Sequence, residues 1–276
     1  MDDFFNGSVK RFGKGLSVSQ DLPDNKFLTQ IMNRGSCRKF NDQPVSDELL
    51  NALCAVALAS PSKSDLQQRD IILIEEQELR DTIRPLLGAS GWAAEAPAFL
   101  VFCGNNRRQR QLHALHGIPF SNDHFDPLFN AIGDAAIALA TFVTAAESQG
   151  LGTCPISQIR NSPDQVNDLL NLPDYVFPFA ALAVGWPVGD DNEISPRLSL
   201  RATVHCSRFD DSSTQPGIEE YDERRREMMP YKKQRHTDLF GKSGTYCWSE
   251  EKARHYSQSE RADFGSYLKK KGFKLL

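Results

Sequence analysis

The chain of 276 residues is 40% hydrophobic and 25% charged, and it carries a formal net charge of −4. These values are typical of a soluble globular protein with one large domain or two small ones. Nucleic-acid binders usually have a strong excess of basic residues, whereas this chain is slightly acidic, so we expect no nucleic-acid partner.

The first residues and the cysteines indicate a cellular location. No apolar segment follows Met1-Asp2-Asp3, so the sequence predicts no signal peptide. The six cysteines contain no CxxC pair, which disfavours a metal or redox site built from neighbouring thiols. We therefore expect a cytoplasmic protein with reduced thiols.

The N-terminal region precedes the first periodic pattern. Residues 1–22 show little periodicity and are expected to form a loosely ordered arm. Apolar residues at helical spacing predict a short helix over residues 24–32. We expect residues 23–198 to form the core of the protein and residues 199–276 to form an extension.

Arg34-Gly35-Ser36-Cys37-Arg38-Lys39-Phe40 follows this helix and is rich in groups that bind anions. On one turn of helix, Arg34 and Arg38 would lie on the same face, close to Ser36. Two guanidinium forks and a hydroxyl suit a phosphate, because each fork forms two parallel hydrogen bonds. The alternative is a short solvated basic patch.

A buried helix and a polar loop come next. Ser46 is a helix N-cap followed by two acidic residues, and the helix to residue 59 is so apolar that we expect it to be buried. Residues 60–68 form a polar loop before a strand at 71–74. The loop is either solvated or a ligand loop, since it joins two buried elements.

The middle of the chain alternates charged and apolar segments. A charged helix is expected over residues 75–87 and a central strand over 98–103. Residues 105–126 contain His113, His116 and His124, but their spacing fits no zinc signature, so we expect no metal site. A lid or a loop that contacts a partner is the preferred interpretation.

Residues 128–149 form the longest apolar helix, and its length approaches that of a membrane span. Asp134 near its middle would be costly in lipid, so we predict a core helix and no membrane partner. A glycine cap at residues 150–152, strands at 153–156 and 177–184, and a helix at 162–172 follow.

Residues 199–276 are polar and rich in charge. They contain a predicted charged helix at 218–229, a basic cluster at 231–236 and an amphipathic helix at 249–271. No second core is apparent, so we expect this extension to wrap around a partner subunit.

Four separated segments together resemble the nitroreductase family of FMN enzymes, and the charged tail, with Glu220-Tyr221-Asp222 and residues 267–273, resembles its NADPH-preferring flavin reductase branch. The four segments are residues 34–38, 60–67, 150–156, and 185–187 with 196–198. The resemblance implies an α+β homodimer: a three-layer sandwich in which helices flank a mainly antiparallel sheet, with FMN at the subunit interface.

The resemblance also assigns roles to individual residues. It places Arg34, Gly35, Ser36, Arg38 and Arg197 at the FMN phosphate. It places Ser62, Gln67, Ser90, Pro155, Ile156, Ser157 and Gln158 around the isoalloxazine ring. No side chain is assigned a catalytic role, because the cofactor carries the chemistry.

The implied reaction is a ping-pong hydride transfer from NADPH through FMN N5 to a nitroaromatic, a quinone or free flavin. Lys232, Lys233 and Arg235 are candidates for the 2′-phosphate of NADPH, with a solvated basic loop as the alternative. Gly35, Asp65, Gln158 and Ser195 depart from the family pattern. Asp65 and Gln158 leave open a non-catalytic flavin carrier or sensor, and other flavin chemistry such as reductive dehalogenation stays open because it shares this scaffold.

Overall fold

The computed structural model describes residues 2–16, 26–189 and 193–275. It divides into two compact units, each of which draws on two separate stretches of the chain. Unit 1 comprises Met1–Gly35 and Asn192–Glu260, and unit 2 comprises Ser36–Asp191 and Arg261–Leu276. The three segments expected from the sequence, 1–22, 23–198 and 199–276, stay a prediction.

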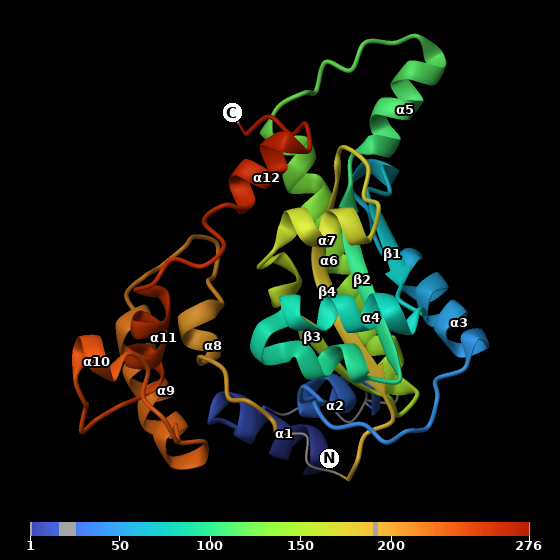
Figure 1. Ribbon diagram of the computed structural model, residues 1–276. Coiled ribbons are helices and arrows are strands. Elements are labelled where there is room, and N and C mark those ends of the chain that lie inside the picture. Colours follow the sequence, from blue (N-terminus) through green and yellow to red (C-terminus); the bar gives the residue numbers. More distant parts are fainter. Residues whose placement is uncertain (1, 17–25, 190–192, 276) are drawn as a thin grey trace. The chain divides into compact units, whose positions relative to one another are not determined.

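Unit 2 contains a four-stranded sheet in the order β1-β2-β4-β3 (Figure 1). Its strands are β1 (Arg69–Leu73), β2 (Ala98–Asn105), β3 (Gly152–Ile156) and β4 (Val176–Gly185). Every neighbouring pair is antiparallel, which confirms the expected sheet type. The central strands β2 and β4 are buried on both faces, which explains their continuous apolar sequences.

Helices cover both faces of this sheet, because successive side chains of a strand point to opposite faces. Leu100 and Phe102 face α3 (Asp47–Leu58) and α6 (Phe125–Ser148). Phe99 and Val101 face α4 (Gln77–Ile83), and the 3₁₀ segments η2 (Arg84–Glu95) and η3 (Ser157–Arg160) and helix α7 (Pro163–Leu169) also lie on that side. The result is the predicted three-layer α+β arrangement.

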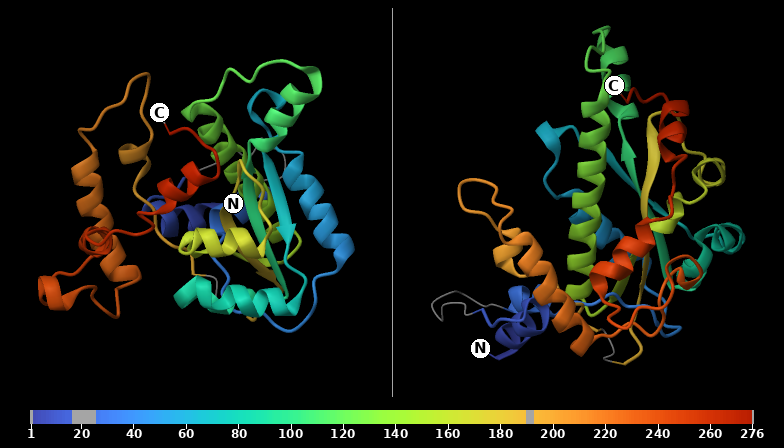
Figure 2. Two further views of the ribbon diagram at one scale, coloured as in Figure 1. Left: turned by 45° about the horizontal axis from the view of Figure 1, so that its top comes forward. Right: turned by 90° about the vertical axis from the view of Figure 1, so that its left-hand side faces the viewer.

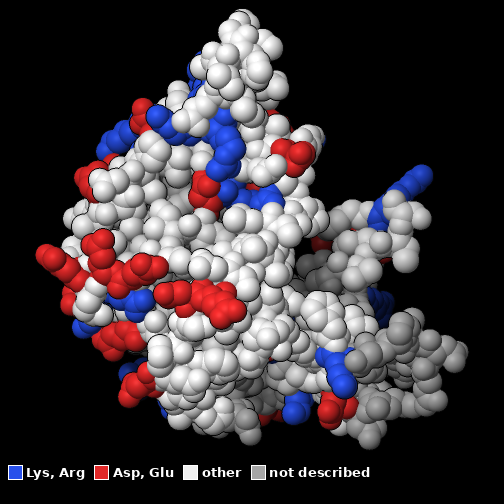
Figure 3. Space-filling view, turned by 90° about the vertical axis from the view of Figure 1, so that its right-hand side faces the viewer, with Lys and Arg blue, Asp and Glu red and all other residues white. Residues whose placement is uncertain are grey.

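Helix α3 begins as predicted, since the Ser46 hydroxyl accepts a hydrogen bond from the Leu49 amide at 3.3 Å. The expectation of complete burial was wrong. Only one stripe packs on the sheet, while Val56 is 48% and Leu58 46% exposed. Figure 3 shows the face of the molecule on which α3 lies in Figure 1. A broad area of this face carries no charged side chains, which are drawn in blue and red.

Helix α6 runs alongside the sheet (Figure 2, right) and is the core helix that the sequence predicted. By length and composition alone it is also long and apolar enough to cross a membrane. Its packing on the sheet accounts for that composition, because Leu139 and Phe142 belong to the core. Phe129 and Ile137 are 63% and 39% exposed.

Two further expectations about helices need correction, one within unit 2 and one where the chain passes from unit 1 to unit 2. Residues 105–126 are not simply a loop, because α5 (Arg107–His116) occupies their first half and ends at Gly117, whose φ is +62°. The single helix predicted at 249–271 is two helices, α11 (Trp248–Tyr256) and α12 (Phe264–Lys270). The end of the chain does join a core, since Tyr267 and Phe273 pack with Leu128 and Phe177.

Unit 1 is helical in its described residues. It contains α1 (Asp2–Phe12), α2 (Lys26–Asn33), α8 (Leu200–Thr203), α9 (Thr214–Met228), α10 (Thr237–Phe240) and α11. The expectation of a loosely ordered arm was wrong for residues 2–12, which form α1, while residues 17–22 lie outside the described residues. Helices α1 and α2 approach closely at Gly7, where an added Cβ would lie 2.1 Å from the Asn33 Oδ1 atom.

Candidate functional site

The segment Arg34–Phe40 is not helical, so the predicted one-turn spacing of its arginines was wrong. The Cys37 amide donates instead to the Thr153 carbonyl at 2.9 Å, which places this part of the segment beside the edge strand β3. The side chain of Cys37 is buried, and burial raises the pKa of its thiol. Arg34 belongs to unit 1 and Arg38 to unit 2.

Several predicted positions lie along the β3 edge of unit 2. Ser36 and Arg38 flank Cys37, and Pro155, Ile156 and Ser157 occupy the end of β3 and the residue after it. Ser90, from η2, donates a hydrogen bond from its hydroxyl to the Gln158 Oε1 atom at 2.6 Å. The structure therefore pairs two of the positions expected at the isoalloxazine ring.

A pocket of about 470 Å³ lies beside Arg38. Its lining combines two cations, two carboxylates and two aromatic rings with smaller residues: Arg38, Lys39, Phe40, Asn41, Asp42, Trp92, Glu95, Ala96 and Pro97. The volume is within the range of ligand pockets. Arg38 is the one predicted site residue in this lining, so the pocket is not the complete predicted site.

Ser62 and Gln67 lie in the loop before β1, which contains a 3₁₀ turn at Lys63–Asp65. Ser64, Asp65 and Gln67 have φ values of +49°, +57° and +51°, a strained conformation for residues other than glycine. Such a backbone persists only where its surroundings fix it. The Ser62 hydroxyl helps to do so, because it accepts from the Gln67 amide at 2.7 Å.

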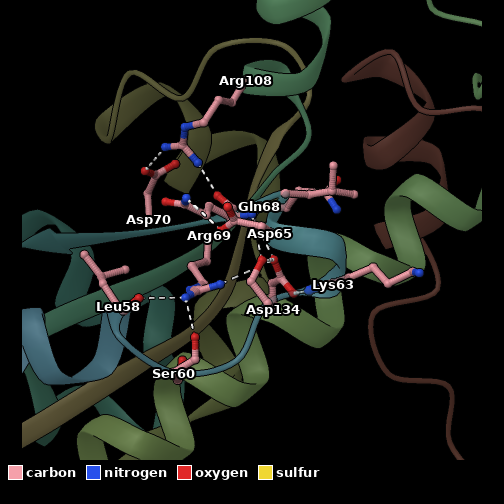
Figure 4. Close-up of polar contacts among 12 residues, drawn as sticks. Leu58, Ser60, Lys63, Asp65, Gln68, Arg69, Asp70, Arg108 and Asp134 are labelled. Atoms are coloured by element: carbon pink, nitrogen blue, oxygen red, sulfur yellow. Dashed lines mark hydrogen bonds and ion pairs between the residues drawn. The ribbon is translucent and has the colours of Figure 1, made fainter.

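Asp134 of α6 is the residue that holds this loop in place, a role that was not predicted from the sequence (Figure 4). Asp134 is only 1% exposed. It accepts hydrogen bonds from the Ser62 hydroxyl at 2.8 Å, the Lys63 amide at 3.0 Å and the Gln68 amide at 2.9 Å. The sequence feature that could have identified this role is a single acidic residue within an apolar helix, because a buried charge needs partners.

Arg69 completes the buried network. Its Nη1 atom lies 3.5 Å from Asp134 Oδ2, and its Nη2 atom donates to the carbonyls of Leu58 and Ser60 at 2.7 and 2.8 Å. The two charges thus connect both ends of the loop to α6 (Figure 4). Ser62 is therefore oriented by Asp134, because its one hydroxyl proton is already donated there.

Helix α5 contacts the loop from another side. Gln109 donates to the Leu66 carbonyl at 2.6 Å, and Arg108 donates to the Gln67 carbonyl while it pairs with Asp70 at 2.7 Å. At least this part of the 105–126 segment supports the loop. That role was not predicted; the expected lid or partner contact stays a prediction.

The two groups of predicted ring contacts do not meet within one chain. The loop with Ser62 and Gln67 lies at the β1 edge and is attached to α6, whereas Ser90 and Gln158 lie at the β3 edge on the opposite face. Strands β1 and β3 are separated by three inter-strand spacings of about 4.8 Å, or roughly 14 Å. The buried strands β2 and β4 lie between them.

Arg34, Gly35 and Arg197 belong to unit 1. The Arg34 carbonyl accepts from Arg11 at 2.6 Å, and Gly35 is buried. The Arg197 Nη1 atom donates to the carbonyls of Ser195 and Pro196 at 3.1 and 2.9 Å.

The predicted NADPH residues have different surroundings. Lys232 and Lys233 are exposed, whereas the Arg235 Nε atom is 2.5 Å from Glu251 Oε1. Although burial opposes it, hydrogen bonds from Tyr246 and Arg235 hold the pKa of Glu251 below its ordinary value. Arg235 is therefore committed to an ion pair within unit 1.

The histidines of residues 105–126 have structural contacts. His124 Nδ1 accepts from the Asp126 amide at 3.3 Å at the start of α6, and the His113 ring packs edge-on against Phe120. Within the described residues, no cluster of histidine, cysteine or acidic side chains is arranged to hold a metal ion.

Comparison with known proteins identifies the family. The Nitroreductase family model matches residues 31–186, and the model of the Nitroreductase family C-terminal domain matches residues 195–276. The FMN reductase [NAD(P)H] of Bacillus subtilis (strain 168) is 34% identical over 255 residues, which span 91% of this chain and 99% of that protein.

Solved structures extend the similarity to the whole fold. NfrA2 of B. megaterium superposes with a TM-score of 0.82 at 31% identity, covering 92% of this chain and 100% of its own. The NADPH:FMN oxidoreductase from Vibrio harveyi, complexed with NAD+, has a TM-score of 0.77 at 27% identity and covers 90% and 98%. The resemblance first suggested by the motifs is thereby confirmed, and the chain belongs to the nitroreductase family.

Proposed function

We propose that the protein is an FMN-dependent NAD(P)H oxidoreductase that passes a hydride from NADPH to a small-molecule oxidant such as a nitroaromatic, a quinone or free flavin. The observation that carries this proposal is the similarity to an FMN reductase over 91% of the chain. Gly35, Asp65, Gln158 and Ser195 remain departures that bear on the choice of oxidant.

The residues present fit FMN chemically. Arg34, Arg38 and Arg197 carry forked donors suited to a phosphate, and Ser36 adds a hydroxyl. Gln158 accepts from Ser90 through its oxygen, and its amide nitrogen has no partner among the described residues, so it is available to a ring carbonyl. Ser62 retains one acceptor lone pair for a ring N–H.

FMN, when bound, supplies the site that accepts and donates the hydride, while the side chains bind and orient it. No described side chain is needed as a catalytic acid or base in this proposal. Lys232 and Lys233 remain candidates for the 2′-phosphate of NADPH. We place the enzyme in the cytoplasm, because all six cysteines are free thiols.

We further propose a homodimer in which each FMN contacts both subunits. The two groups of ring contacts lie on opposite edges and faces of one sheet, so a second copy is needed to unite them. Exposed apolar side chains on one layer offer the surface for that copy: Val56, Leu58, Phe129 and Ile137. The extension of residues 199–276 would wrap around the partner.

The visible spectrum tests the cofactor and its donor together. We expect the purified protein to show flavin absorption bands that NADPH bleaches anaerobically, faster than NADH does. Steady-state oxidation of NADPH with a quinone or nitroaromatic then measures turnover. A colourless protein that takes up no added FMN would contradict the proposal, and bound FMN without turnover would favour the flavin carrier.

Charge placed on α6 tests the dimer. We expect Ile137→Asp to give a monomer in light scattering and to lose FMN, because a carboxylate would be buried unpaired at the interface. Thr82→Asp on α4 is the matched control, since Thr82 is exposed on the opposite helical layer. A dimeric Ile137→Asp protein that keeps FMN would exclude this face as the interface.

A further inference from the structure

Helix α1 lies outside the parts of the chain that the family models match, since these begin at residue 31. It nevertheless contains one of the most buried arginines of the described chain. Arg11 is only 6% exposed, although its neighbour Lys10 is exposed. A guanidinium is rarely buried unless its donors are satisfied, so the partners of Arg11 indicate its role.

The partners of Arg11 among the described residues include main-chain carbonyls from two distant segments of unit 1. Nε and Nη2 donate to the Met32 carbonyl at 3.2 and 2.9 Å, and Nη2 also donates to the Arg34 carbonyl at 2.6 Å. Nη1 donates to the Ser195 carbonyl at 3.0 Å. The Arg11 carbonyl in turn accepts from the Arg197 amide at 2.6 Å.

One residue therefore links the backbones of the two segments that carry Arg34 and Arg197. Both are proposed ligands of the FMN phosphate, and two cations on adjoining segments repel each other when no anion is present. A guanidinium has five donors in a fixed fork, which allows Arg11 to hold both segments at once. A lysine ammonium lacks that geometry.

Helix α1 is itself held within unit 1 by several contacts. Gly7 allows close contact with Asn33, and Ser8, which is fully buried, donates to the Phe5 carbonyl at 2.7 Å and accepts from the Leu16 amide at 2.8 Å. Arg224 adds a hydrogen bond to the Arg197 carbonyl from α9. The phosphate-binding segments are thus supported from two helices.

We propose that Arg11 is a positioning residue for the phosphate end of the cofactor site, supplied by a helix outside the matched family domains. This inference rests on the proposed FMN function. Arg11 donates to the protein backbone and not to the ligand. Its loss should therefore weaken recognition of the phosphate and leave recognition of the ring unchanged.

Titration of the apoprotein with FMN and with riboflavin, which lacks the phosphate, tests the inference. For Arg11→Ala we expect the preference for FMN over riboflavin to fall by about tenfold, or ~1.4 kcal/mol. Lys10→Ala, one residue away on the same helix, should keep the wild-type preference. Arg11→Lys keeps the charge but not the fork, and it should behave like Arg11→Ala.

Riboflavin affinity serves as the internal check on folding. An unchanged ratio in Arg11→Ala would overturn the inference, as would an equal loss for both ligands, which would indicate a general structural defect. Wild-type behaviour of Arg11→Lys would show that the fork is not required. If the wild-type protein binds neither ligand, the proposed function itself fails, a result distinct from all of these.

Discussion

Replacing Asp134 by alanine is expected to lower the free energy of unfolding by about 3–5 kcal/mol, the typical cost of breaking a buried ion pair on one side. The change leaves the Arg69 guanidinium, 4% exposed, without its carboxylate. It also removes the acceptor of the Ser62 hydroxyl and of two loop amides. Urea unfolding measures the loss from the shift of the midpoint.

Two comparisons give this prediction its specificity. Asp126→Ala changes an exposed acid in the first turn of the same helix and should cost under about 1 kcal/mol. A double-mutant cycle with Arg69→Ala should give a coupling free energy of about 1 kcal/mol or more. Strictly additive effects would show that the two buried charges do not stabilise each other.

The same substitution should affect the cofactor. The strained residues Ser64, Asp65 and Gln67 depend on their surroundings, so the loop is expected to relax once Asp134 is gone. We therefore expect weaker flavin binding under conditions in which the variant is still folded. This separates the local role of Asp134 in the site from its global role in stability.

Much of unit 2 could be predicted from local patterns. The strand at Ala98–Asn105 and the helix at Phe125–Ser148 follow from long apolar segments with clear ends, and the Ser46 cap fixed the start of α3. The family motifs then placed the candidate ligands. Local periodicity sufficed here because packing and propensity favoured the same structure.

The errors have tertiary causes. Arg34 and Arg38 look like a helical pair, but the backbone of Cys37 is hydrogen-bonded beside β3. Helix α3 looks wholly buried, because exposed apolar residues cannot be told from core residues by composition. Neither the hydrogen-bond donors to the Asp134 carboxylate nor the carbonyls that accept from the Arg11 side chain are local, since they lie 66 to 72 and 21 to 184 residues away.

Arg38→Ala is the substitution for which we expect the largest loss of cofactor affinity. Arg38 is exposed beside the pocket at the β3 edge, and within the described residues its side chain makes one long hydrogen bond, 3.5 Å to the Ser36 carbonyl. Its donors are thus available to a ligand phosphate. A charged hydrogen bond contributes about 1.5–3 kcal/mol, so the FMN dissociation constant should rise by roughly 10- to 100-fold.

The contrast with neighbouring residues decides whether Arg38 contacts the phosphate directly. Lys39→Ala removes an adjacent exposed cation and should reduce FMN affinity only slightly, because a general electrostatic effect is screened by salt. Arg38→Ala should leave riboflavin affinity and the urea midpoint unchanged, unlike Asp134→Ala, which changes both. FMN affinity equal to that of the wild type would mean that Arg38 lines the pocket without binding the phosphate, and the anchoring role would then fall to Arg34 and Arg197.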